Sequence, residues 1–235
     1  MKQLKVLSAI GLLAVAGVAQ AEVTSSIAIT SDYDFRGFTQ TGESPALQLS
    51  LDFATDFGLY AGIWGSNVDQ FSDGGLNTAS TEVDAYVGFS GEAGAFGWDA
   101  GLVYYTYEGA SDLNFAELYG KFSISIVSFG VYFSNDFGGK ATGDSGDSAL
   151  YGYVDLGIPA GPISIDLHAG LSSGDGIEAA YGVPGEDSYT DFAVGLSYSA
   201  SNFTTGIKYT AYDFGDGGSD GRIVLTVSTS LPWGE

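Results

Sequence analysis

The single histidine of the chain is the first residue whose neighbours suggest chemistry. His168 follows Asp166 by two residues, and Ser164 lies two residues before that acid. Residues of one parity share a face of a strand, so a serine, an acid and an imidazole would meet there, as in a lipid hydrolase. Such an enzyme needs its serine and histidine within hydrogen-bond reach where lipid can enter, and His168 shares the parity of the charged residues, away from lipid. We therefore favour a hydrogen-bonding role for His168, and we predict that the protein is not an enzyme and has no catalytic residue.

Two acidic, glycine-rich stretches suggest calcium binding. They are DFGDGGSDG at residues 213–221 and SGDGIE at residues 173–178. Neither has the D-x-[DN]-x-[DN]-G spacing of a calcium loop, so we favour solvated loops. The chain has no cysteine, which excludes a disulfide scaffold and thiolate metal sites. We predict no metal site and no cofactor.

The stretch SDYDFRGFTQT, residues 31–41, places two acids and Arg36 among aromatic residues. Before and within this stretch, apolar residues occupy alternate positions and charged residues occupy positions between them. We therefore predict a strand over residues 23–36 with one apolar and one polar face. The apolar set is Val23, Ile27, Ile29, Tyr33 and Phe35, and the charged set is Asp32, Asp34 and Arg36. We expect Arg36 to pair with Asp34 or Asp52, and the alternative is a solute-selecting role.

Alternation of apolar and polar residues recurs along nearly the whole chain. It defines about twelve stretches of about ten residues, the length that a tilted strand needs to cross a bilayer. Long polar links and tight turns alternate between them, which is the plan of an outer-membrane barrel. Aromatic residues gather beside the tight turns like a membrane-interface girdle: Phe53, Phe57, Phe89, Phe96, Trp98, Phe129, Tyr198 and Phe203. A secreted β-sandwich is the less favoured alternative.

The N-terminus has the pattern of a secretory signal. Residues 1–21 (MKQLKVLSAIGLLAVAGVAQA) combine two lysines, an apolar run and a terminal A-x-A motif. We predict a signal peptide over 1–21 and a barrel over 22–235, exported through the periplasm. Among the chain's seven basic residues only five follow the signal, against 29 acids, so phosphate backbones would be repelled and nucleic acid is excluded as a partner.

The segments SDYDFRGFTQTGESPALQLSLDF, GLYAGIWGSNVD, EVDAYVGFSGE and LVYYTYEGASDLNFAELYG resemble, in this order, the TorF-type porin family, also known as the Gcw_chp family. The resemblance is specific from about Ser31 to Gly120. It implies an outer-membrane β-barrel with a channel function and no settled substrate.

We therefore predict an all-β, membrane-spanning antiparallel up-and-down barrel in the outer membrane of a Gram-negative bacterium. It would be a passive, cation-preferring channel for small solutes or ions. Its expected partners are outer-membrane lipid and lipopolysaccharide, and a homo-oligomer is compatible with this architecture. A structural or adhesive barrel with a blocked lumen is the alternative. The predicted pore-lining residues are Asp34, Arg36, Asp52, Glu82, Asp84, Asp99, Glu117, Lys121, Asp155, Asp166, His168, Asp191, Lys208 and Arg222.

Overall fold

The computed structural model describes residues 22–69, 78–142 and 147–233 of the chain. The predicted signal peptide, residues 1–21, lies outside the described residues. Within them, twelve antiparallel strands form one closed barrel. Strand β1 (Glu22–Thr30) closes it by pairing with β14 (Ser219–Trp233) on one side and with β4 (Ala46–Ala54) on the other. The predicted fold class is confirmed.

The other strands follow in chain order around the ring. They are β5 (Leu59–Asn67), β6 (Thr81–Ala93), β7 (Phe96–Glu108), β8 (Phe115–Ile124), β9 (Val127–Ser134), β10 (Ala149–Ala160), β11 (Ile163–Ser173), β12 (Ser188–Ala200) and β13 (Phe203–Asp213). Two further short strands, β2 (Asp34–Phe35) and β3 (Phe38–Thr39), form a separate hairpin. A helix, α1 (Asp175–Tyr181), and three 3₁₀ turns (Ser111–Leu113, Gly139–Thr142 and Gly215–Gly217) lie in the loops. No helix in the described ranges is long and apolar enough to cross a membrane.

The strands place their apolar side chains outside and their charged side chains inside. Leu49, Val87 and Leu225 are 47%, 45% and 54% exposed, whereas Asp84 and Arg222 on the other parity are 7% and 8% exposed. A soluble sandwich would bury the first set, so this inverted polarity marks a wall that faces lipid. The eight aromatic residues of the predicted girdle are all exposed, between 40% and 68%, as expected for that interface.

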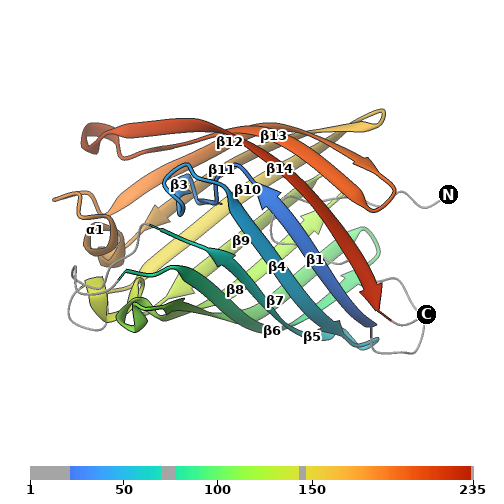
Figure 1. Cartoon of the computed structure of the whole chain (residues 1–235), viewed down its shortest axis with the longest axis horizontal. Helices are drawn as coiled ribbons and strands as arrows, with labels where there is room; N and C mark the ends of the chain where they lie inside the picture. Colours follow the sequence, from blue (N-terminus) through green and yellow to red (C-terminus); the bar gives the residue numbers. More distant parts are fainter. Residues whose placement is uncertain (1–21, 70–77, 143–146, 234–235) are drawn as a thin grey trace.

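The two ends of the barrel differ in their connections. Figure 1 shows α1 and β3 at one end, and the start of β1 and the end of β14 at the other. At the second end the strands turn within two residues after β6, β8, β10 and β12, and the first residue of each turn has positive φ, as in type II′ hairpins. The turn after β8 is Ser125–Ile126. The predicted rule of long and short links is confirmed.

The inverted polarity predicts the cost of a charge on the outer wall. Leu225→Arg should lower the free energy of unfolding in lipid by about 2–4 kcal/mol, because the guanidinium would enter the hydrocarbon layer. The matched control is Ser219→Arg, on the same face of β14 but at the loop end, where the cost should be about 0–1 kcal/mol. Urea titration of the barrel in vesicles measures both. Equal effects of the two changes would contradict the lipid-facing assignment.

Candidate functional site

Residues 31–45 leave the barrel wall and fold into the lumen. β1 ends at Thr30, and the chain then forms the β2–β3 hairpin, in which Asp34 pairs with Thr39 and Phe35 with Phe38. Its two turn residues, Arg36 and Gly37, have φ of 50° and 88°, the signs of a type I′ turn. A Cβ atom on Gly37 would lie 3.0 Å from side-chain atoms of Asp191 and Tyr212, so the tip packs closely on β12 and β13. The predicted strand over residues 23–36 is therefore six residues too long.

Ion pairs hold the base of the hairpin to one side of the barrel. Arg222 on β14 donates from Nε to Asp32, and its Nη2 lies 2.6 Å from Asp34 Oδ1. Its Nη1 also donates to the carbonyl of Gly37 at 2.6 Å. On β13, Lys208 Nζ lies 2.7 Å from Asp34 Oδ2. Two acids of the hairpin are thus neutralised by two bases of adjacent strands.

The tip of the hairpin binds the facing wall. Arg36 donates from Nη1 and Nη2 to the two carboxylate oxygens of Glu117 on β8, at 2.9 and 2.6 Å. Tyr105 donates to the same carboxylate at 2.9 Å, and the guanidinium lies 4.2 Å from the ring centre of Tyr151. In the closed ring, β8 is six strands from β14 in either direction. Through the Arg36 side chain, the hairpin therefore bridges two facing walls of the lumen.

Aromatic side chains fill the space around this crossing. Phe38 stacks on Tyr212 and on Tyr181 of α1, with ring centres 3.9 and 4.1 Å apart. Tyr33 packs edge-on against Trp64 at 5.2 Å. Burial raises the pKa of Tyr181 to about 12, so the helix presents a neutral phenol to the cluster. The prediction that Tyr33 and Phe35 share the lipid-facing parity was wrong, because the strand had already ended.

Every predicted pore-lining residue lies on the inner side of the barrel. Twelve of them are on strands: Asp52, Glu82, Asp84, Asp99, Glu117, Lys121, Asp155, Asp166, His168, Asp191, Lys208 and Arg222. Asp34 and Arg36 were predicted on the wall and are instead on the inserted hairpin. Arg36 does pair with a carboxylate, but its partner is Glu117 and neither Asp34 nor Asp52. The structure thus gathers the set in one lumen, and their role in lining a path remains a proposal.

His168 lies between two carboxylates. Its Nδ1 is 2.6 Å from Asp155 and its Nε2 is 2.7 Å from Asp191, with the Tyr151 hydroxyl at 2.9 Å. Ser164 donates to Asp166 instead, at 2.7 Å. In the described part of the chain no hydrogen bond joins His168 to a serine, so the arrangement offers no activated nucleophile. The geometry matches the hydrogen-bonding role favoured from the sequence.

Burial of the inner side chains varies along the lumen. Near the hairpin, the side chains of Arg36 and Glu117 are 7% and 1% exposed. At mid-depth, those of Asp155 and Lys208 are 32% and 33% exposed. The lumen is therefore closely packed around the hairpin. It is also closely packed at Asp99 and Lys121, toward the short-turn end of β7 and β8, where these residues are 6% and 9% exposed.

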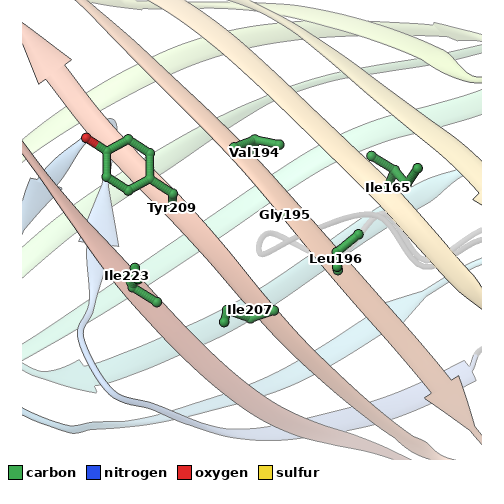
Figure 2. Close-up of a pocket in the computed structure, with 7 residues that line it drawn as sticks. All are labelled: Ile165, Val194, Gly195, Leu196, Ile207, Tyr209 and Ile223. Atoms are coloured by element: carbon green, nitrogen blue, oxygen red, sulfur yellow. The ribbon is translucent and has the colours of Figure 1, made fainter.

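The outer wall carries a shallow groove that offers no polar chemistry. Figure 2 shows it across β11, β12, β13 and β14, with Ile165, Leu196 and Ile207 among its lining residues. These side chains have the lipid-facing parity, so the groove fits hydrocarbon and no polar solute.

Sequence reasoning missed the hairpin contacts made by Tyr33, Phe35 and Phe38. The available signal was the dipeptide Arg36–Gly37, because a glycine after a polar residue between alternating segments is typical of a two-residue turn. The aromatic residues at alternate positions favoured a continued strand instead of a turn, because aromatic residues are also expected on a lipid-facing strand.

The family of the chain follows from comparison with known proteins. The family model described as "Bacterial protein of unknown function (Gcw_chp)" matches residues 15–220. No curated protein matches the sequence. The match covers most of the barrel, including the inserted hairpin, so the resemblance seen in the sequence extends well beyond Gly120.

Solved structures share the architecture at low sequence identity. A structure of the NanC porin matches with a TM-score of 0.57 and 15% identity, over 88% of this chain and 100% of that chain. A structure of the KdgM porin in complex with disordered oligogalacturonate matches with a TM-score of 0.51 and 10% identity, over 89% and 99%. Identities this low establish the fold alone. The chain belongs to the Gcw_chp family and folds as a twelve-stranded membrane barrel like those of outer-membrane porins.

Proposed function

We propose that this protein is a passive outer-membrane channel that prefers small cations. The observation that carries the proposal is the charge balance of its lumen. Each basic side chain there is already paired with an acid, in Arg36–Glu117, Lys121–Asp99, Lys208–Asp34 and Arg222–Asp32. Four further lumen acids make no ion pair with a described residue: Asp52, Glu82, Asp84 and Asp166.

Unpaired acids in a narrow passage select by charge. Walls of low dielectric constant focus the field of the carboxylates, which enriches cations and depletes anions at the constriction. A bare barrel of twelve strands has a backbone diameter of roughly 24 Å, of which wall side chains occupy on the order of half. The hairpin narrows this further, so the proposed solutes are inorganic ions and small organic cations.

The likeness to porins supports a channel, and the lumen charge argues for a different solute class from that of KdgM. That porin was solved with oligogalacturonate, a polyanionic sugar. An acidic lumen would repel such a chain, because the lumen acids here outnumber the lumen bases. We therefore do not extend that ligand to this protein.

A barrel with a blocked lumen is the second candidate, and one observation favours it. The hairpin binds both facing walls through buried ion pairs, and its aromatic side chains pack on α1 and β13. If that packing leaves no continuous path, the acidic loops would carry the function. Conductance separates the two candidates.

We also propose that residues 1–21 are an export signal removed at the periplasmic face of the inner membrane. Mass spectrometry of the barrel purified from outer membranes should find Glu22 as the first residue. A chain that retains Met1 would contradict this proposal.

The charge balance predicts the sign of the reversal potential. Across a tenfold KCl gradient in a planar bilayer, the potential should have the sign of K⁺ preference. The preference should weaken at high salt, because the Debye length falls from about 10 Å at 0.1 M to about 3 Å at 1 M. A clear Cl⁻ preference would reject the proposal, and the absence of any conductance steps would favour the blocked barrel.

The Arg36–Glu117 pair predicts a stability effect. Arg36→Leu should lower the free energy of unfolding by about 3–5 kcal/mol, because Glu117 would keep a buried charge with no counter-charge. Arg36→Lys should cost less, since it keeps the charge and loses only the bidentate geometry. Denaturant unfolding in detergent or lipid measures both variants. An equal loss for the two would argue against a charge-based role.

The same pair predicts a change in pore width. Replacing both residues by alanine should raise single-channel conductance, because it releases the hairpin tip without leaving an unpaired charge. The matched control replaces Lys121 and Asp99, a lumen ion pair on the wall that does not contact the hairpin. Its effect on conductance should be smaller. An equal or larger increase in the control would show that the hairpin does not set the narrowest point.

A further inference from the structure

Two acids beside the hairpin carry buried oxygen atoms that no described group satisfies. Glu82 and Asp84 lie two residues apart on β6, on its inner face, and are 1% and 7% exposed. Glu82 Oε2 and Asp84 Oδ1 are buried and accept no hydrogen bond in the part of the chain that the structure describes. Burying a carboxylate without a counter-charge is costly, and two adjacent ones repel each other.

Two hydroxyl groups of the described residues donate to the pair, and both donate to the same oxygen. Tyr33 of the inserted segment and Tyr107 of β7 donate their hydroxyls to Glu82 Oε1, at 3.3 and 3.4 Å. Burial and the charges of Glu82 and Asp84 raise the pKa of the Tyr33 phenol, so it stays protonated and acts as a donor. The strand register places Trp64 and Tyr105 beside Asp84.

In the part of the chain that the structure describes, the four bases of the lumen are all engaged with other acids. The nearest arginine of the hairpin, Arg36, is held by both oxygens of Glu117, and Lys121 binds Asp99. Lys208 and Arg222 bind the acids at the hairpin base. The charge of the two buried carboxylates must therefore be balanced from solution, by a proton on one and a cation on the other, or by protons alone.

We propose that Glu82 and Asp84 form a binding site for a compact monovalent cation, between the inserted segment at Tyr33 and the wall formed by β5, β6 and β7. Hard carboxylate oxygens suit an alkali cation. A divalent ion fits less well, because no group of three or more acidic or histidine side chains suited to a metal occurs in the described residues.

This inference deepens the proposed function and rests on it for the route by which the cation arrives. A site beside the hairpin would lie in a closely packed part of the path, where occupancy by a cation excludes anions. Conduction also requires binding that is weak enough for release. A cation held by two carboxylates with few further ligands meets that requirement.

The test compares two double variants that remove equal charge. Glu82→Gln with Asp84→Asn removes the proposed site. Asp52→Asn with Asp166→Asn is the matched control, because those acids also lack an ion pair but have every oxygen satisfied by hydroxyl donors. Thermal unfolding is measured in KCl and in N-methylglucamine chloride at equal ionic strength. The large organic cation is the reference that the buried site excludes.

Wild type and control should unfold at a higher temperature in K⁺. With K⁺ at about five times its Kd, linkage predicts a rise in Tm of about 2–4 °C. The site variant should lose this rise, and Glu82→Gln alone should reduce it if the double variant cannot be recovered. A rise that persists in the site variant overturns the proposal. So does a wild type whose Tm depends on pH and not on the cation, because the pair would then hold a proton.

Conductance distinguishes failure of the site from failure of the channel. If the bilayer shows no current but K⁺ still stabilises wild type and not the site variant, the site stands and the proposed function fails. If the channel prefers cations but K⁺ stabilises nothing, the function stands and the site fails. When both stand, the site variant should lose more cation preference than the control.

Discussion

The bidentate pair between Arg36 and Glu117 completes a bridge across the barrel, and the shape of the lumen depends on it. The other end of the bridge is the contact of Arg222 and Lys208 with Asp32 and Asp34. Buried ion pairs are weak evidence for stability, because desolvation offsets the attraction. Their cost is highest when one partner is missing, so each charge on the hairpin restricts it to the position that matches the wall. These ion pairs therefore fix the position of the hairpin more than they stabilise the fold.

Barrel size explains why the lumen has room for such a bridge. In a membrane barrel every second side chain of each strand points inward, away from lipid. Eight strands give a lumen that side chains fill, whereas sixteen leave an aqueous channel. Twelve lie between these limits, and wall side chains leave a gap that residues 31–45 occupy near one end. The tyrosines pack against each other there, as Tyr132 and Tyr151 do with ring centres 6.4 Å apart.

The sequence predicted the wall of the barrel far better than its contents. Alternation with period two assigns each wall residue to lipid or lumen, and Ile29 and Arg222 were placed correctly for that reason. The same alternation continues through Tyr33 and Phe35, where the chain has left the wall, because aromatic residues suit both lipid and a packed lumen. The alternation also could not predict which charged residues form ion pairs. Arg36 and Glu117 are separated by 81 residues, and only barrel closure and hairpin insertion bring them together.

The acids of the lumen fall into three groups that differ in the partners of their carboxylate oxygens. Some acids pair with bases, which fixes the hairpin. Asp52 and Asp166 accept hydroxyl hydrogen bonds on both oxygens, so neither carboxyl group has an unsatisfied oxygen. Glu82 and Asp84 have neither kind of partner for two of their oxygens, and they lie where the hairpin leaves least room. A charge is most costly where space and donors are both scarce, so a mobile cation gains most by binding there.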